Sequence, residues 1–291
     1  MAVIKTQSFG QAAEIMSISQ PSVSVHIKSL ENKLGSKLFT RSPGQVPKVT
    51  ESGQFLMTYA NEILNQTQEL QSVLLNGKKQ LKIGAQRFVT QTLLGSTFET
   101  LSGALKEVEV IVRTGTFEEV RDLYLKREVD LAFFLTTKDD TPSWLTTQIN
   151  QYRLALIAHP NHPLAKNKTA SIGQLTSYPF IVAFKQSYFS KSIDLLLAKN
   201  GIQIKNVAAQ AEDAGTVKEM VKAGMGLAFT LLHSVRSEID RGELVEIDLD
   251  SAPMYFQLGY AKNLTPVNAE IEDLIEKMKI SIEYKKYQNL Y

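Results

Sequence analysis

The sequence predicts an α/β protein that begins with a helix-turn-helix, continues through one long helix and ends in a body of alternating strands and helices. Three observations favour this fold class. Residues 19–34 carry helical start and stop signals around an apolar stripe, residues 51–76 run without proline, and from Leu81 onward short apolar strands alternate with helical segments. With 291 residues, the chain is long enough for two or more domains.

Composition indicates a globular protein. Hydrophobic residues make up 43% of the chain and charged residues 21%, and no apolar run is long enough to span a bilayer. The N-terminus lacks the apolar region and cleavage site of a signal peptide, so we expect a cytoplasmic protein with no membrane partner. The absence of cysteine excludes disulfides, thiolate metal sites and thiol-based redox sensing. No cofactor is indicated.

The charge is unevenly distributed along the chain. Residues 1–50 hold six lysines and arginines and two acidic residues, which gives a charge of +4. Because the whole chain has a net charge of +2, residues 51–291 sum to −2. A basic module on a near-neutral body fits a polyanionic partner, although the same excess also fits a solvated surface.

Residues 19–34 predict a helix with clear ends. Ser19 can cap its first turn, Pro21 falls where a missing N–H is harmless, and Gly35 stands where a helix ends. The expected buried stripe is Val23, Ile27, Leu30 and Leu34. Upstream, QAAEIM predicts a short helix that packs closely through Ala12 and Ala13, and SIS is a tight connection. This is a helix-turn-helix pattern, whose second helix enters the DNA major groove, with an ordinary helical hairpin as the alternative.

These residues also carry a family resemblance. The motifs are Ala12-Ala13, Ser19-Gln20-Pro21-Ser22-Val23-Ser24, Ile27, Leu30-Glu31, Leu34-Gly35, Leu38-Phe39, Arg41 and Thr50-Glu51-Ser52-Gly53. Together they resemble the signature of LysR-type transcriptional regulators, and LKIG, DLA, HPNHPLA and AGMGLA extend the likeness at a lower level. The resemblance implies a winged helix-turn-helix, a long linker helix, and a two-lobed effector domain like type 2 periplasmic binding proteins. It also implies a homodimer or homotetramer that binds promoter DNA and a small-molecule effector, with RNA polymerase as a further partner.

The resemblance assigns residues to double-stranded promoter DNA. Gln20, Pro21 and Ser24 are expected to face the groove, and Lys28 a phosphate. The wing turn is SPGQVP. Because Val25 stands where the family often has arginine, it can meet a thymine methyl but cannot grip guanine. The expected DNA-binding set is Ser19, Gln20, Pro21, Ser22, Ser24, Val25, His26, Lys28, Arg41 and Lys48.

The resemblance further implies a longer beginning. Relatives carry about two more helical turns before the segment that resembles VIKTQSFGQAA, and these supply apolar residues under the recognition helix. We therefore expect a working product longer than the chain that starts at Met1. If Met1 is the start, we expect an exposed DNA-binding core.

Residues 51–76 predict a linker helix that pairs with a second copy. Leu56, Ile63 and Leu70 lie seven apart, as in a coiled coil. The expected dimerisation set is Leu56, Tyr59, Ile63 and Leu70. Because Gln66, Thr67 and Gln68 interrupt this stripe, the alternative is a helix that packs on its own domain. Polar residues and a glycine in NGKKQ end the helix.

From Leu81 the period becomes that of alternating strands and helices. The predicted strands are LKIGA, VEVIV, DLAFFL, YRLALIAH, FIVAF, VAAQ and YFQLGYA, and the predicted helices are residues 90–105, 116–127, 189–200 and 214–224. This pattern alone fits several doubly wound folds, and the resemblance selects the two-lobed one. The predicted domains are 1–50, a linker helix at 51–76, and an effector domain at 81–291. Its first lobe is 81–155 with 256–291, and its second is 156–255.

Polar residues follow three predicted strands, where ligands of two-lobed α/β domains bind. Thr116 matches a ligand-contacting position of the family. Arg87 and Lys185 favour an anionic effector such as an organic acid, although basic loop residues are more often solvated. The expected effector-binding set is Gln86, Arg87, Thr90, Thr116, Lys185, Ser187, Tyr188 and Thr230.

An enzyme is an alternative of a different class, because α/β domains host many reactions. The sequence has no nucleophile elbow, phosphate-binding loop or metal triad, so neither a catalytic residue nor a metal site is predicted. His159 and His162 indicate a turn, and GMGLA indicates a helix-to-strand turn. A second alternative is a ligand-sensing or solute-binding module whose DNA binding is impaired by the shortened N-terminus.

Two single residues complete the expectations. Arg127 occupies a place usually held by a helix-ending glycine, so a left-handed backbone there would carry about 1 kcal/mol of strain. Trp144, the sole tryptophan, is expected to anchor a surface loop.

Overall fold

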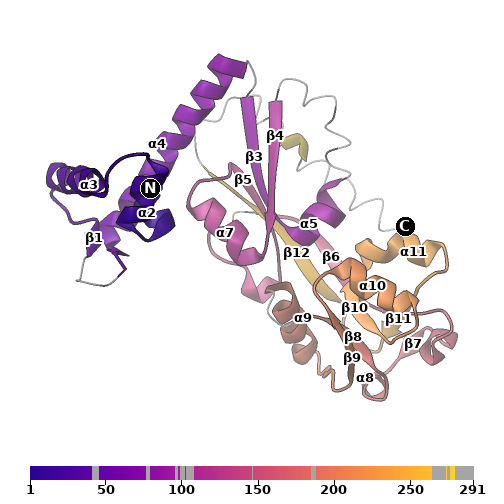
Figure 1. Cartoon of the computed structure of the whole chain (residues 1–291). Coiled ribbons are helices and arrows are strands. Elements are labelled where there is room, and N and C mark those ends of the chain that lie inside the picture. Colours follow the sequence, from indigo (N-terminus) through magenta and orange to yellow (C-terminus); the bar gives the residue numbers. More distant parts are fainter. Residues whose placement is uncertain are drawn as a thin grey trace. The chain divides into compact units, whose positions relative to one another are not determined.

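The computed structural model describes residues 1–40, 46–76, 79–95, 98, 102, 108–145, 147–184, 188–263, 273 and 276–278. The chain forms two compact units (Figure 1). The first comprises Met1–Lys79 with Leu125–Glu128, and the second comprises Gln80–Tyr124 with Val129–Tyr291. The predicted start of the effector domain at Leu81 falls beside this division. The predicted split of that domain into two lobes stays a prediction.

The first unit contains the predicted helix-turn-helix. Its elements are α1 (Ala2–Thr6), α2 (Phe9–Ile15), α3 (Gln20–Leu34), β1 (Phe39–Thr40), β2 (Lys48–Val49) and α4 (Glu51–Asn76). The antiparallel pair β1–β2 forms the base of the wing, while 41–45, with Arg41, lie outside the described residues. The core of this unit is Val3, Ala12, Ala13, Val23, Leu38 and Phe39. Because Val3 of α1 is buried in it, the expectation of an exposed DNA-binding core is wrong.

The ends of α3 are as predicted, but its buried face is not. Ser19 Oγ accepts from the Ser22 N–H at 3.3 Å, and Gly35 has the left-handed φ of 65°. Of the expected stripe, Val23 is buried and Ile27 half-buried, whereas Leu30 and Leu34 are 38% and 48% exposed. Glu31 is buried instead, because its carboxylate accepts hydrogen bonds from the segment that leads into the wing.

The predicted helix at 51–76 is confirmed as α4. Thr50 fixes its start, since its Oγ1 accepts from the Gly53 N–H at 3.0 Å and donates to the Lys37 carbonyl at 2.6 Å. A Cβ at Gly53 would overlap the Leu38 carbonyl oxygen. This glycine lets α4 start close against β1.

Within the described residues, the second unit contains an eight-stranded mixed sheet. Its order is β4 (Val108–Gly115), β3 (Lys79–Gln86), β5 (Leu131–Thr136), β12 (Met254–Lys262), β6 (Thr147–Ala158), β11 (Val245–Leu249) and β7 (Thr169–Ala170), with β10 (Ala228–Leu231) also on β6. β3 and β5 run parallel, and β12 lies antiparallel between β5 and β6. A separate parallel pair joins β8 (Phe180–Ala183) to β9 (Val207–Ala211). The long strands β6 and β12 thus connect the two ends of the unit.

Helices flank these strands (Figure 1). They are α5 (Arg87–Val89), the π-helical turn η1 (Thr90–Leu94), α7 (Phe117–Leu125), α8 (Ile172–Leu175), α9 (Tyr188–Lys199), α10 (Ala214–Lys222) and α11 (Arg236–Asp240), with 3-10 turns η2 (Lys138–Asp140), η3 (Pro163–Lys166) and η4 (Leu232–Val235). α5 and α7 lie at the β3–β5 end, and α9 and α10 at the β8–β10 end. Each of these helices directly follows a strand or a short loop after one.

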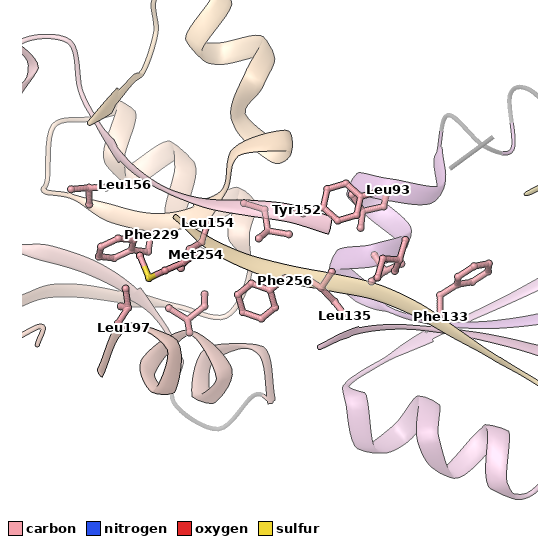
Figure 2. Packing of buried hydrophobic residues seen from close by; sticks show 14 of the residues in the cluster. Leu93, Phe133, Leu135, Tyr152, Leu154, Leu156, Leu197, Phe229, Met254 and Phe256 are labelled. Carbon is pink, nitrogen blue, oxygen red and sulfur yellow. The ribbon is translucent and has the colours of Figure 1, made fainter. Parts of the chain in front are cut away.

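One apolar core runs along β6 and β12. Figure 2 follows it from Leu93, Phe133 and Leu135, past Phe256, to Phe229 and Leu197. Phe133 and Phe256 are fully buried. Burial of such side chains contributes on the order of 1.5–3 kcal/mol each, which ties both ends of the unit to one pair of strands.

All seven predicted strands are present, while the short strands β7, β10 and β11 of the same unit were not among them. The predicted helix at 90–105 is helical where it can be compared, but it starts earlier, at Arg87 of α5, and Thr90–Leu94 are π-helical; much of 96–107 lies outside the described residues. In GMGLA, Gly224 has a φ of 78°, and a Cβ at Gly226 would lie 2.5 Å from the Pro179 carbonyl oxygen. The predicted helix-to-strand turn therefore requires glycine. Arg127 has a φ of 54°, which confirms the predicted left-handed site.

Candidate DNA-binding surface and effector cavity

The start of α3 offers polar side chains to solvent. Gln20, Pro21, Val25, His26 and Lys28 are exposed, and Ser22 and Ser24 are half-buried. Ser19 Oγ also lies 2.8 Å from Ser22 Oγ, so capping occupies these two hydroxyls. Of the expected DNA-binding set, Lys48 is exposed on β2 and Arg41 lies outside the described residues.

A groove separates α3 from the base of the wing. It has a volume of about 550 Å³ and is lined by Ser24, Val25, Lys28, Glu31, Lys37, Phe39 and Thr40. Lys28 and Lys37 line it, so a polyanion in contact with α3 would meet positive charge from two segments.

Glu31 joins the two sides of this groove. Its carboxylate accepts from the Leu38 N–H at 2.9 Å, the Phe39 N–H at 3.3 Å and Lys37 Nζ at 3.0 Å. Desolvation raises the pKa of Glu31, but these three hydrogen bonds outweigh it and hold the pKa below its ordinary value. Sequence analysis noted Glu31 as part of a motif and missed this role, since a charged side chain is expected in solvent when its partners are not known.

The exposed face of α4 is apolar. Phe55, Tyr59, Ile63, Leu70 and Leu74 are all at least half exposed and fall within one stripe. Leu56 is half-buried and packs on the core of its own unit. The predicted dimerisation residues therefore fall into two groups. Tyr59, Ile63 and Leu70 are exposed and could contact a second copy, whereas Leu56 packs within its own unit.

The second unit encloses a cavity of about 690 Å³. Its first wall comes from segments around β3, α5, α7 and β5, and its second wall from β8, β9, β10, α9 and α10. The first wall is Gln86, Arg87, Phe88, Gln91, Gly115, Thr116, Phe117 and Leu135; the second is Ile181, Val182, Ala183, Phe184, Tyr188, Phe189, Ser190, Ile193, Asp194, Ile204, Glu212, Asp213, Ala214, Val217, Phe229 and Thr230. Aromatic and aliphatic groups dominate, with polar groups at the two sides, as in small-molecule sites.

Gln86 and Arg87 give the first wall two groups that donate hydrogen bonds, while Gln91 and Thr116 can both donate and accept. Gln86 lines the cavity and is 6% exposed, and its Oε1 accepts from the Leu135 N–H at 2.6 Å, which leaves its Nε2 as the group that can donate to a ligand. Thr116 precedes α7 and shares a capping box with Glu119, whose Oε2 accepts from the Thr116 N–H at 2.8 Å. Arg87 is exposed at the cavity edge.

The polar groups of the second wall are mainly acceptors. Asp213 caps α10, and the hydrogen bonds from the Thr216 hydroxyl and N–H lower the pKa of its carboxyl. Ser234 Oγ donates to the Leu231 carbonyl at 2.7 Å, so Thr230 must supply the proton of its 3.2 Å contact with Ser234. Thr230 Oγ1 thus keeps only lone pairs for the cavity.

Several contacts join the two walls. Tyr188 stacks on Phe117 at a ring distance of 3.9 Å, and its hydroxyl donates to the Asp140 carbonyl at 3.0 Å. Phe88 stacks on Phe189 at 5.1 Å, and Lys199 Nζ lies 2.6 Å from Asp139. Burial raises the pKa of Tyr188, so this phenol stays a neutral donor across the working pH range.

The expected effector-binding residues divide into three groups. Gln86, Arg87, Thr116, Tyr188 and Thr230 line the cavity. Thr90 does not line it, and its hydroxyl donates to the carbonyl of Gln86, at the end of β3, at 3.4 Å. Lys185 and Ser187 lie outside the described residues.

Sequence reasoning missed the acidic side of the cavity. Asp194, Glu212 and Asp213 line the second wall. Glu212 and Asp213 follow the predicted strand VAAQ, and an aspartate just before a helical segment is a capping signal. The logic applied to the other strand ends would have found these two residues.

The two histidines of the HPNHP segment stabilise a turn. His159 Nδ1 accepts from the Asn161 N–H, and His162 Nδ1 accepts from the Leu164 N–H at the start of η3, as expected of a turn. In the described part of the chain, no group of three or more histidine or acidic residues could hold a metal ion, and no helix is long and apolar enough to cross a membrane. Trp144 is half-buried in the loop before β6 and packs against Phe134 and Tyr124, at ring distances of 4.9 and 5.5 Å, as expected of a residue that anchors a surface loop.

Comparison with known families decides the class of this protein. Residues 1–54 match the family model described as the bacterial regulatory helix-turn-helix protein, lysR family, and residues 76–276 match the LysR substrate binding domain. The chain belongs to the LysR family. It is a LysR-type DNA-binding transcriptional regulator with an effector-binding domain, and regulators of this family bind promoter DNA and small-molecule effectors and act as oligomers. Because the helix-turn-helix is present, a module with impaired DNA binding is not favoured.

Individual LysR relatives cover nearly the whole chain. The chain is 27% identical to the HTH-type transcriptional regulator CysL of Bacillus subtilis, over 96% of this chain and 93% of CysL. It is 26% identical to the HTH-type transcriptional activator CmpR of Synechocystis, over 87% and 83%. These names describe regulators rather than enzymes, which fits the predicted absence of catalysis.

Solved LysR structures share the fold. A full-length OxyR from Pseudomonas aeruginosa has a TM-score of 0.64 at 20% identity, over 97% of this chain and 91% of OxyR. ArgP from Mycobacterium tuberculosis has a TM-score of 0.66 at 16% identity, over 97% and 94%.

Proposed function

We propose that this LysR regulator reads its operator with the start of α3. The supporting observation is the exposed run of Gln20, Val25, His26 and Lys28 beside a groove that Lys28 and Lys37 line. In this proposal Gln20 and Ser24 meet base edges, Val25 meets a thymine methyl, and Lys28 and Lys48 meet phosphates.

The regulator works as a homo-oligomer in the cytoplasm. The apolar stripe of α4 pairs two copies, and their α3 helices bind half-sites about one helical turn apart. RNA polymerase is a further partner in this proposal.

The effector binds in the cavity of the second unit. The cavity combines an apolar lining with polar groups on two facing walls, and Arg87 supports the predicted anionic group on the effector. Binding closes the walls further and changes the geometry between paired copies, and hence the bend of the DNA. Such coupling requires that the effector bind one arrangement more tightly than the other.

Fluorescence anisotropy tests the DNA-binding proposal. The purified protein is titrated onto DNA from upstream of its own gene, with nonspecific competitor, across a salt series. Specific binding that survives competitor is expected, with an affinity that falls as salt rises. Equal, weak binding on all DNA would contradict the proposal.

Variants of α3 separate its two roles. Lys28→Ala should weaken binding on all sequences alike and reduce the salt slope by about 1, whereas Val25→Ala should relax preference at one thymine. Lys33→Ala is the control, because Lys33 is exposed but lies on a different face of α3. A Lys33 variant with the same effect as the Lys28 variant would count against direct contact by Lys28.

A further inference from the structure

The two walls of the effector cavity differ in the charged groups and in the hydrogen-bonding groups that they offer to a ligand. On the first wall, Gln86 Nε2 and the Arg87 guanidinium have no partner within the described part of the chain. Both groups can only donate. Gln86 is 6% exposed and lines the cavity, so a ligand bound there can accept from its amide in place of water.

The second wall presents acceptors to the same cavity. The Glu212 carboxylate has no ion pair or hydrogen bond within the described residues. Thr230 is buried, and its hydroxyl donates to Ser234 Oγ, so toward a ligand it can only accept a hydrogen bond. Asp213 adds a second carboxylate.

An anion alone is a poor match for this cavity. Helix N-termini attract anions, but the protein's own carboxylates already occupy two of those that face the cavity. Glu119 accepts from the Thr116 N–H at the start of α7, and Asp213 accepts from the Thr216 N–H at the start of α10. Only Gln86 and Arg87 therefore remain to bind an anionic group, and the carboxylates of the opposite wall would repel it.

We propose that the effector is an amphoteric molecule with an apolar body, of the size of an apolar amino acid or dipeptide. Its carboxylate accepts from Gln86 Nε2 and Arg87, and its ammonium donates to Glu212 and Thr230. Its body lies against Phe117, Tyr188 and the aliphatic lining between the walls. This inference rests on the proposed effector cavity and names its ligand class.

Matched ligands test each charge separately. The probes are L-phenylalanine and leucyl-phenylalanine, each with an N-acetyl form that lacks the ammonium and a carboxamide form that lacks the carboxylate. Binding is followed by the thermal unfolding midpoint and by the emission of Trp144, which packs near Phe117. We expect at least one amphoteric probe to bind, and loss of either charge to weaken it about tenfold or more.

Variants assign the charges to the walls. Arg87→Gln should remove the advantage of the free carboxylate, and Glu212→Gln that of the free ammonium, each leaving the other intact. Lys166→Gln and Asp250→Asn are charge-matched controls on exposed residues outside the cavity lining, and both should bind as the parent does.

Three results would overturn the inference. One is an N-acetyl form that binds as tightly as the free amine, another is no binding by any probe. The third is a non-additive effect of Arg87→Gln and Glu212→Gln on the ligand-free unfolding midpoint, which would mean that the two side chains pair with each other. Specific DNA binding in the anisotropy experiment is independent of these results, so the regulator function can stand while this ligand class fails.

Discussion

At the residue scale, the structure assigns roles that spacing in the sequence did not. Glu31 occupies a buried place on α3 where an apolar stripe was expected, because three hydrogen bonds compensate its desolvated charge. Thr90, expected at the effector, donates instead to the carbonyl of Gln86 at the end of β3. A side chain's role here depends on which backbone groups lie within reach, and helical or strand periodicity does not encode that.

Glu31→Gln should make the first unit less stable in a pH-dependent way. The pKa of Glu31 is lowered by folding, so its stabilisation is present above the ordinary carboxylate pKa and is lost as pH falls through the lowered value. We expect a loss of about 1–2 kcal/mol at pH 7 that shrinks as the pH falls below the ordinary glutamate pKa and Glu31 becomes protonated. Thermal unfolding followed by circular dichroism across this range measures it. Glu14→Gln, at an exposed glutamate, is the control, and a pH-independent difference would contradict the role given to Glu31.

At the element scale, helix ends were predictable and helix faces were not. The starts and stops of α3 and α4 follow from Ser19, Gly35 and Thr50, whose capping is local. Which face of α4 is covered depends on distant segments, so Leu56 packs on its own unit while Ile63 stays 63% exposed. An exposed apolar stripe of this kind on a long helix favours a partner.

Ile63→Glu should weaken self-association of the protein. A charge in the centre of the apolar stripe would lose hydration on pairing, so the dimer dissociation constant should rise at least about tenfold. Analytical ultracentrifugation measures it. Gln54→Glu is the control, because Gln54 is exposed and lies on the opposite side of α4. Unchanged association of the Ile63 variant would place the interface elsewhere.

At the scale of the whole molecule, the second unit has a cavity between two walls, and strands β6 and β12 connect the two ends of the unit. β6 and β12 carry one core through both ends of the sheet, and the cavity lies between segments that are far apart in the sequence. Tyr188 crosses that space by stacking on Phe117 and donating to the Asp140 carbonyl. The distance between the walls therefore depends on a small number of contacts near the ligand.

Tyr188→Phe should weaken effector binding while the fold is kept. The ring still stacks on Phe117, but the hydrogen bond to the Asp140 carbonyl is lost. The arrangement in which the two walls are in contact should therefore lose about 1 kcal/mol of stability, which lowers the affinity for the effector roughly five-fold. Titration of an effector against Trp144 emission measures this change. Tyr178→Phe is the matched control, because Tyr178 lies outside the cavity lining. An equal loss in both variants would indicate a general effect on stability rather than a contact between the walls.

The sequence by itself determined the class of this protein, the helix-turn-helix, the long helix and all seven predicted strands, because capping residues, glycines and apolar periods act over a few residues. It also pointed to Gln86, Arg87, Thr116, Tyr188 and Thr230 as cavity residues, because ligand sites follow strand ends. Only the tertiary structure decided that Glu31 is buried, that Tyr188 reaches Asp140, and that donors and acceptors face each other across the cavity. These features depend on which residues of different elements come together in space, such as Tyr188 and Asp140, which are 48 positions apart, and no local pattern records that.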